Sequence, residues 1–312
     1  MHWRNARHLL LGAALCAAIP LIAHARQDDQ IFKSAAELVV LHVNVFDKRS
    51  DAVPELPQSA FTVFEDDKPQ DIAFFSAGDV PVTVGLIIDN STSMLTERDM
   101  VVSGTSAFAE SSHPEDEMFA IIFNEHVRAG LPDTIDFTRN RMQLRVSLQR
   151  FPAGGKTAFY DAVIAGLDHL EKAGYQKRVL VVMSDGGDNA SRHTEKEMLD
   201  RVSSDNALVY TVLDPNVVVP GEAKPQVLRR LAQLSGGLAY FPRSDRALVS
   251  AFREIAGNIR RGYSIGYLPS SSAQHHHDER HRVKVMVRVP GRSDLSVRVR
   301  NGYTEAVTPG TR

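Results

Sequence analysis

Five residues with oxygen donors stand in three short polar segments of this sequence, each next to a predicted strand or helix. Asp89, Ser91 and Ser93 alternate along the first segment. Thr157 follows a Gly-Gly-Lys sequence in the second segment, and Asp185 precedes two glycines in the third. Their two carboxylates and three hydroxyls are hard oxygen ligands, which select hard cations. The residue types therefore point to a divalent metal site.

A magnesium ion prefers near-octahedral coordination at about 2.0–2.1 Å and tends to keep several waters. Protein donors of this kind, some of them acting through water, leave a coordination position for an oxygen from outside. A carboxylate of a partner protein fits that position and brings the missing charge. The residue types do not distinguish Mg²⁺ from Mn²⁺ as the bound ion.

An α/β architecture would gather these segments at one place. Between residues 80 and 260, apolar runs of strand length alternate with amphipathic stretches of helix length, which favours an α/β domain with a mostly parallel central sheet. In such a sheet, ligands bind beyond the carboxyl ends of the strands. The predicted strands are 82–88, 118–123, 179–183 and 208–213, and the predicted helices are 97–112, 139–150, 159–173, 195–204, 226–234 and 245–260.

The three segments resemble the metal-ion-dependent adhesion site of von Willebrand factor A (VWA) domains and integrin inserted domains. In that family, an Asp-x-Ser-x-Ser motif, a threonine from a second loop and an aspartate from a third bind the ion. Asp89, Ser91 and Ser93 match the motif, Thr157 matches the threonine, and Asp185 matches the last aspartate. The resemblance covers about 80–260. It implies a Rossmann-like three-layer VWA domain that captures an Asp or Glu of a protein partner and is not an enzyme.

Short strands are predicted on both sides of this domain. In an N-terminal β unit, 37–79, the alternation of Val39, Leu41, Val43 and Val45 with more polar neighbours is typical of a half-buried strand. In the C-terminal segment, 262–305, a turn-rich linker separates the last two predicted strands, which predicts a hairpin. The other predicted strands are 61–64, 72–75, 263–268, 283–289 and 295–299.

The predicted C-terminal hairpin would carry a row of basic residues on its polar face. Such a face usually lies in solvent and protects sheet edges, so any membrane contact would have to be made through it. Together the two flanks resemble a bacterial exported subfamily of VWA proteins. The sequence sets neither the oligomeric state nor the identity of the partner. The basic residues are Arg280, Arg282, Lys284, Arg288, Arg298 and Arg300.

The first 25 residues have the pattern of a cleaved signal peptide. Arg4 and Arg7 precede an apolar run, 9–23, and Ala23-His24-Ala25 ends it with small residues at the positions that a signal peptidase reads. The run is shorter than the roughly 20 residues that a membrane span needs. Cleavage would remove Cys16, the only cysteine. We therefore expect an exported protein, periplasmic or extracellular, without disulfides.

Composition excludes some functions and leaves others open. Cleavage removes two arginines, so the mature chain has 36 − 2 = 34 basic and 38 acidic residues, net −4, and nothing global indicates nucleic acid. Two alternatives to a binding module remain. A metal-assisted hydrolase would activate water on the same ion, although the three segments contain neither a histidine nor a Gly-x-Ser-x-Gly motif. A structural component of an envelope assembly would leave the metal site inactive.

Four further features of the sequence are interpreted as structural. Gly155-Lys156-Thr157 is not a phosphate loop, because Arg150 replaces the required earlier glycine. Asp161 is expected in the first turn of its helix, where a carboxylate is favourable, and Asp188 is expected to be a solvated loop carboxylate. The three histidines 275–277 and His281 are expected in a solvated polar loop rather than at a metal.

Overall fold

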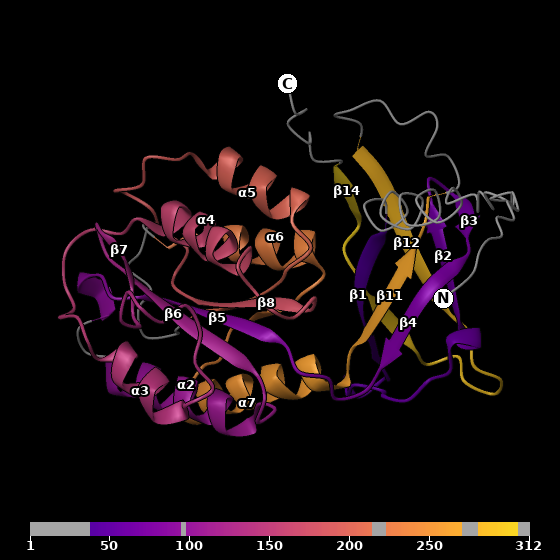
Figure 1. Cartoon of the computed structure of the whole chain (residues 1–312), viewed down its shortest axis with the longest axis horizontal. Helices are drawn as coiled ribbons and strands as arrows, with labels where there is room; N and C mark the ends of the chain where they lie inside the picture. Colours follow the sequence, from indigo (N-terminus) through magenta and orange to yellow (C-terminus); the bar gives the residue numbers. More distant parts are fainter. Residues whose placement is uncertain (1–37, 95–97, 214–222, 270–279, 305–312) are drawn as a thin grey trace, which may run out of the picture. The chain divides into compact units, whose positions relative to one another are not determined.

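The computed structural model describes residues 38–94, 98–213, 223–269 and 280–304. The predicted signal peptide, 1–25, and the histidines 275–277 lie outside the described residues. Within the described part of the chain, the strands form one six-stranded and two four-stranded sheets (Figure 1). No helix of this part combines the length and the apolar character needed to cross a membrane.

The six-stranded sheet is mostly parallel, as predicted. Its order is β10-β9-β8-β5-β6-β7, and the neighbours are parallel except for β6 and β7. Its central strand is buried along its whole length, which explains the near-continuous apolar run in the sequence. The strands are β5 (Thr83–Asp89), β6 (Glu117–Phe123), β7 (Val127–Ala129), β8 (Arg178–Met183), β9 (Leu208–Val212) and β10 (Ala239–Tyr240).

Helices cover both faces of this sheet (Figure 1). One apolar cluster joins α2, α3 and α7 to one face, and a second joins α4, α5 and α6 to the other. This three-layer arrangement confirms the predicted α/β class. The helices are α2 (Arg98–Ser111), α3 (Arg141–Leu148), α4 (Phe159–Leu170), α5 (Glu195–Ser204), α6 (Pro225–Ser235) and α7 (Asp245–Arg261).

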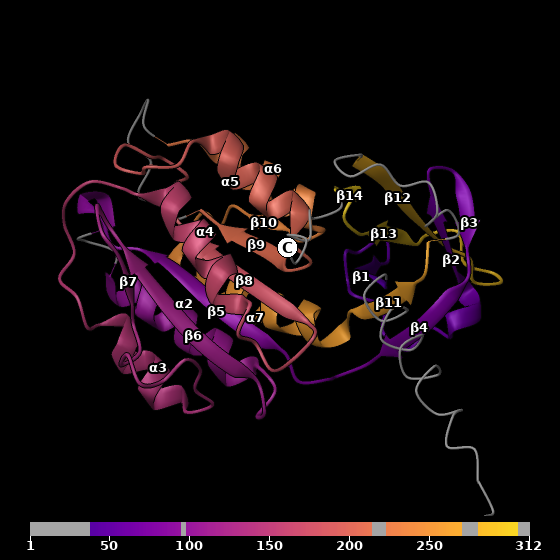
Figure 2. The ribbon, with the colours of Figure 1, turned by 45° about the horizontal axis from the view of Figure 1, so that its top comes forward.

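The segments before and after this domain fold together into a β-sandwich (Figure 2). Its sheets have the orders β13-β1-β11-β4 and β14-β12-β2-β3, and a third apolar cluster lies between them. Each sheet therefore contains strands from both segments. The strands are β1 (Val39–Phe46), β2 (Phe61–Glu65), β3 (Lys68–Gln70), β4 (Ile72–Ala77), β11 (Tyr263–Tyr267), β12 (Arg280–Val287), β13 (Ser296–Arg298) and β14 (Gly302–Thr304), with the 3-10 helix η1 (Gln58–Ala60) before β2.

The predicted C-terminal hairpin is wrong, because its two strands belong to different sheets. β12 pairs with β2 and β14, whereas β13 pairs with β1. Val283 and Val285 of β12 pack in the sandwich core with Val63 of β2. Both strands of the predicted hairpin thus pair with strands of the N-terminal segment, and the linker between them crosses from one sheet to the other.

The basic residues expected on one face of this hairpin are also divided, because its strands belong to different sheets. Arg280, Arg282 and Lys284 alternate as exposed residues on β12. Arg300 is only 5% exposed, and its guanidinium donates to the Asp205 carbonyl at 3.0 Å and to Asn206 Oδ1 at 2.8 Å. The predicted row is therefore not one solvent-facing surface.

A buried polar layer lies where the β-sandwich meets the α/β domain. Along β1, Leu41 and Val43 enter the sandwich core, so His42 and Asn44 point to the opposite face. Both are nevertheless buried, at 5% and 2% exposure. Asn44 Nδ2 donates to the hydroxyl of Tyr210 in β9 at 3.4 Å. The flanking strands are thus packed against the α/β domain by polar contacts.

Candidate metal centre

The five candidate ligands lie on three loops at the carboxyl ends of β5 and β8 or beside them. Asp89 is the last residue of β5, and Ser91 and Ser93 follow it in the turn that contains the 3-10 helix η2 (Thr92–Met94). Thr157 stands two residues before α4, and Asp185 two residues after the end of β8. Because β5 and β8 are parallel neighbours, the first and third loops start side by side.

The first loop is organised around the Asp89 carboxylate, which is 2% exposed. Asp89 Oδ1 accepts from the backbone N–H of Ser91 at 3.0 Å, and Asp89 Oδ2 accepts from the hydroxyl of Ser184 at 2.8 Å. The hydroxyls of Ser91 and Ser93 lie 3.1 Å apart. The tight turn therefore brings alternate side chains together, as the Asp-x-Ser-x-Ser spacing predicted.

Hydrogen bonds tie the first loop to the second. The carbonyl of Asn90 accepts from Gly154 N–H at 2.8 Å, and the Thr92 hydroxyl donates to the Gly155 carbonyl at 3.0 Å. The Asn90 amide also donates to the carbonyls of Phe151 and Pro152. The segment that leads to Thr157 is thus held against the Asp89 loop by backbone and side-chain contacts.

The second loop is tied to the third in the same way. Thr157 N–H donates to Asn189 Oδ1 at 2.8 Å, and Asn189 N–H donates to the Thr157 carbonyl at 2.9 Å. Asp188 Oδ2 accepts from Tyr160 N–H at 3.1 Å and from the Ser191 hydroxyl. Asp188 is half-buried, so its expected role as a solvated carboxylate is wrong: it satisfies donors in the first turn of α4.

Asp161 has a structural role in the same region. Its carboxylate accepts from the backbone N–H groups of Arg192 and His193 at 3.0 Å each, and from His193 Nδ1 at 2.8 Å. It therefore fixes the chain that follows the third loop. Sequence reasoning did not identify Asn90, Ser184 or Asn189, whose polar side chains join loops that are distant in sequence.

The charge at this edge of the sheet favours a bound cation. Burial raises the pKa of Asp89 to about 6, hydrogen bonds from Ser91 and Ser184 act in the opposite direction, and the nearby charge of Asp185 raises it further. Asp185 is itself buried, at 7% exposure, and accepts from Gly187 N–H at 2.8 Å. Two buried carboxylates that repel each other, together with hydroxyl oxygens, fit a hard divalent cation.

A second group of possible metal-binding atoms lies in the β-sandwich. Ligand atoms of Glu65, Asp66 and His281 lie within 4.8 Å of one another. These atoms already serve the fold, because His281 Nδ1 bonds Asp66 Oδ2 at 2.8 Å and Glu65 Oε2 accepts from the hydroxyls of Tyr267 and Tyr303. His281 is 4% exposed on β12, so its expected place in a solvated loop is wrong.

Comparison with known proteins rests on the fold. No protein-family model and no curated protein matches the chain. The solved structure of a von Willebrand factor type A protein from Catenulispora acidiphila matches with a TM-score of 0.52 and 14% identity, over 86% of this chain and 74% of that one. This chain has the von Willebrand factor type A fold. In the sequence, the VWA domain lies between the two segments that form the β-sandwich.

Two other solved structures match a smaller share of the chain, each with a TM-score of 0.47. An aerotolerance-related membrane protein from Bacteroides fragilis matches at 16% identity over 57% of this chain and 98% of that one. The vWF domain of the type V pili tip protein Mfa5 from Porphyromonas gingivalis matches at 11% identity over 58% and 95%.

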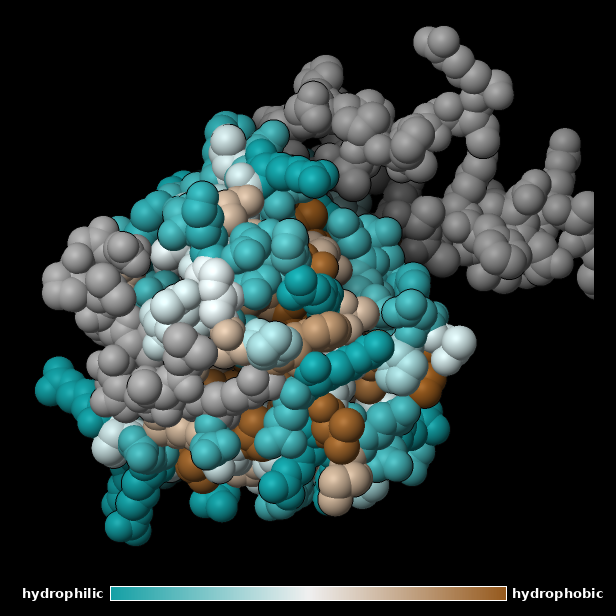
Figure 3. All heavy atoms as spheres, turned by 90° about the vertical axis from the view of Figure 1, so that its left-hand side faces the viewer, coloured by the Kyte–Doolittle hydropathy of each residue, from teal (hydrophilic) through white to brown (hydrophobic). Residues whose placement is uncertain are grey.

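The carboxyl ends of β5 and β8 point away from the β-sandwich. Figure 3 shows the molecule from this side, with a mainly hydrophilic surface interrupted by smaller hydrophobic areas. Lys156, in the second loop, and Thr92, in the first, are exposed, whereas Asp89 and Asp185 are buried below the surface. A ligand that reaches the candidate centre therefore has to present its own oxygen to recessed carboxylates.

Proposed function

We propose that this protein is an exported, metal-dependent protein-binding module of the adhesion type. Asp89, Ser91, Ser93, Thr157 and Asp185 would hold Mg²⁺ or Mn²⁺, and the site would capture an Asp or Glu side chain of a protein partner. The observation that supports it best is the pair of buried carboxylates, Asp89 and Asp185, whose charges interact unfavourably at the ends of adjacent strands.

The donor set explains why such a site would bind an acidic group. When bound, a divalent cation supplies positive charge and a coordination position that the chain does not fill. Only two of the five protein donors, the carboxylates, are anionic, and a hard cation binds anionic oxygens more strongly than neutral ones. An anionic oxygen from a partner is therefore a better last ligand than a neutral one. The hydrogen bonds that Asp89 accepts from Ser91 and Ser184 hold its oxygens in place before the partner arrives.

The hydrogen bonds of the histidine near the third loop favour binding over hydrolysis. His193 follows the third loop, and its Nδ1 is bonded to Asp161 at 2.8 Å. The Asp161 carboxylate is occupied by two backbone N–H groups as well. Asp161 and His193 thus fasten a loop instead of presenting a base to water on the ion. Export is proposed from the signal-peptide pattern of residues 1–25.

Metal-dependent capture can be tested with the mature chain as bait. A pull-down from an envelope extract is carried out with Mg²⁺ and with EDTA, using wild type, Asp89→Ala and the control Asp133→Asn. Asp133 is an exposed carboxylate after β7 and lies outside the three loops. We expect wild type and Asp133→Asn to retain a partner in Mg²⁺, and we expect EDTA or Asp89→Ala to release it.

Circular dichroism shows whether Asp89→Ala is folded, and calorimetric titration shows whether Mg²⁺ binds. Wild type that takes up no Mg²⁺ would contradict the metal site itself. If wild type takes up Mg²⁺ but folded Asp89→Ala still retains the partner, the adhesion mechanism is contradicted. Turnover of ester or phosphate substrates that requires Mg²⁺ and is lost in Asp185→Ala would instead support the hydrolase.

A further inference from the structure

Within the described residues, β10 forms one of the two lateral edges of the six-stranded sheet, and β7 forms the other. The carbonyls of Leu238 and Tyr240 accept hydrogen bonds from the N–H groups of Thr211 and Leu213, at 3.0 Å each. Because peptide groups alternate in direction along an extended strand, the N–H and carbonyl of Ala239 point away from β9. Outward-facing peptide groups of this kind are a template for pairing with another strand.

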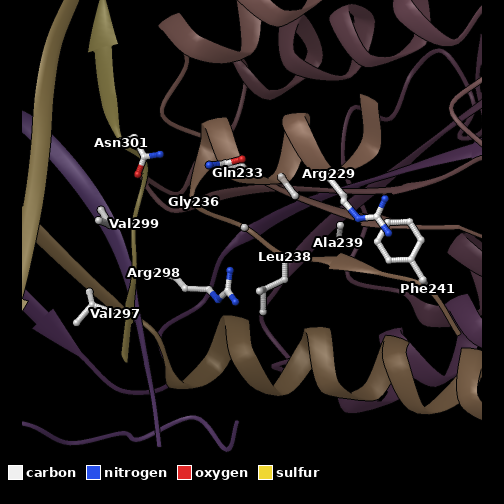
Figure 4. A pocket seen from close by; sticks show the side chains of 12 residues that line it. Arg229, Gln233, Gly236, Leu238, Ala239, Phe241, Val297, Arg298, Val299 and Asn301 are labelled. Carbon is white, nitrogen blue, oxygen red and sulfur yellow. The ribbon is translucent and has the colours of Figure 1, made fainter. Parts of the chain in front are cut away.

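Cavities border this edge on both faces of the sheet, and residues of β13 line both of them. A cavity of about 400 Å³ borders it on the side of α6, and Figure 4 shows Arg229, Gln233, Arg298 and Asn301 around it. A second cavity, of about 170 Å³, borders it on the opposite side, where Glu254 of α7 contributes to the lining. The residues that line both cavities are Leu238, Ala239 and Arg298. We call the two cavities and the edge between them the β10 groove.

The walls of the β10 groove are fixed by a close approach of two backbones. Gly236 ends α6 in the left-handed conformation, with φ of 86°, which favours glycine. A Cβ at Gly236 would lie 2.6 Å from Arg300 N and 2.9 Å from the carbonyl carbon of Val299. The end of α6 and the chain after β13 therefore touch, and the groove is already formed without a ligand.

The wall of the groove on the α6 side is positively charged. The guanidinium of Arg229 lies 4.1 Å from the centre of the Phe241 ring, an arrangement that leaves the N–H groups at its edge available to a carboxylate. Arg298 is exposed between the two cavities. Among the described residues, the ion pairs include neither arginine. The half-buried Val297 and Val299 give this cavity an apolar side.

We propose that the β10 groove binds an extended acidic segment of a partner protein, which adds a strand to the edge of the sheet beside Ala239. Side chains of an added strand alternate between the two faces of the sheet. Acidic side chains on the α6 face would pair with Arg229 and Arg298. On the α7 face, Glu254 would repel acidic residues and favour neutral ones. The preferred segment is therefore acidic at every second position.

The β10 groove and the candidate metal centre use different groups of the VWA domain. The groove lies along the lateral edge of the sheet, whereas the metal centre lies at the carboxyl ends of β5 and β8. Strand addition uses peptide groups and arginines, so it does not require a cation. Binding in the groove is thus expected to persist in EDTA and in Asp89→Ala, which separates it from the proposed adhesion function.

The probe is a fluorescein-labelled peptide, Glu-Val-Glu-Thr-Glu-Val-Glu, whose binding to the mature chain is followed by fluorescence anisotropy in EDTA. Two comparison peptides replace Glu by Gln or place the same residues as Glu-Glu-Val-Thr-Val-Glu-Glu. We expect Arg229→Gln and Arg298→Gln each to weaken binding of the probe about tenfold, the loss of one strong charge-assisted contact. Arg246→Gln, an exposed arginine of α7 outside both cavities, serves as the matched control and should bind as wild type.

Ala239→Pro tests the backbone contact, because proline removes an N–H that faces away from β9 and is tolerated at sheet edges. We expect this variant to keep its far-UV circular dichroism and to lose the probe. Equal binding of all three peptides, or unchanged binding by folded Arg229→Gln and Arg298→Gln, would overturn the proposal. So would a self-association of wild type that Arg298→Gln abolishes, because the occupant would then be a second copy of this chain.

Discussion

The buried histidine of β1 allows a quantitative test of the layer between the β-sandwich and the VWA domain. Burial, followed by the positive charges of Lys177, Arg300 and Arg178, lowers the pKa of His42 from 6.5 to about 3. His42 Nδ1 lies 3.1 Å from the hydroxyl of Ser264 in β11, and the residue is 5% exposed. In the folded protein, His42 is therefore neutral over the whole range in which an unfolded histidine becomes charged.

The direction in which stability changes with pH follows from proton uptake. Below pH 6.5 the unfolded chain binds a proton at His42 and the folded chain does not, so the stability contributed by His42 is complete above pH 6.5 and is lost as the pH falls toward 3. Between pH 6.5 and pH 5, the difference corresponds to 1.5 pH units at 1.36 kcal/mol each, about 2 kcal/mol. Wild type should therefore lose about 2 kcal/mol more between pH 7 and pH 5 than His42→Gln, which cannot take up this proton.

Urea unfolding of wild type and His42→Gln at both pH values measures this difference. Asp89 has a raised pKa of about 6 and acts in the opposite direction, but it is present in both proteins and cancels in the comparison. NMR gives a direct reading, because the His42 ring should show no titration down to pH 4. A ring that titrates near pH 6.5, or two proteins with the same pH dependence, would refute a neutral buried His42.

Three further predictions concern stability. Mg²⁺ at about 100 times its dissociation constant should stabilise the wild type by about 2.7 kcal/mol and raise its thermal midpoint. Asp185→Ala should show no saturable increase in thermal midpoint. An equal increase in both proteins would place the ion elsewhere. Asn140→Ala removes the side chain that accepts from Met142 N–H and Gln143 N–H at the start of α3. The substitution should lower the free energy of unfolding by about 1 kcal/mol. Urea unfolding measures this loss, with Gln149→Ala at the other end of that helix as the comparison. Gly236→Ala should cost more than about 1 kcal/mol, since it adds a Cβ 2.6 Å from Arg300 N in a left-handed conformation; a neutral effect by urea unfolding would contradict the tight contact between α6 and the chain after β13.

The strands and helices of the VWA domain could be predicted because their apolar pattern is local. The predicted strand 179–183 corresponds to Arg178–Met183 and the predicted helix 195–204 to Glu195–Ser204. The pattern missed β3, β7, β10 and β14, each of two or three residues, because a run that short carries no measurable periodicity. One of the missed strands, β10, is the edge on which the proposed strand addition depends.

Strand pairing could not be predicted in the same way. The alternation of Val283, Val285 and Val287 shows that one face of β12 is buried, but the same alternation fits any partner strand. A short linker made the strand at 295–299 the nearest candidate, whereas β2, more than 200 residues away, is the actual partner. The sandwich core decides the pairing, because its apolar side chains come from both segments and each of its two sheets combines strands of both.

The candidate ligands were identified from residue types at the ends of predicted strands, and the structure adds how they are supported. Asn90 and Ser184 stand next to candidate ligands in the sequence and Asn189 four residues after Asp185, but their partners are on other loops. A single sequence shows that such a residue is polar and not which loop it contacts. The informative signal is their position: polar residues that can form side-chain bonds cluster in the same short segments as the ligands.

The polar layer around His42 also bears on where the VWA domain ends. Boundaries drawn at the changes of pattern near residues 80 and 261 would separate Asn44 from the Tyr210 hydroxyl, and Arg300 from the Asp205 carbonyl and Asn206. Apolar surfaces could be buried by many partners, whereas a buried guanidinium is tolerated only opposite acceptors at defined positions. We infer that this layer fixes the orientation of the β-sandwich on the VWA domain, and with it the wall of the β10 groove that Val299 and Asn301 form.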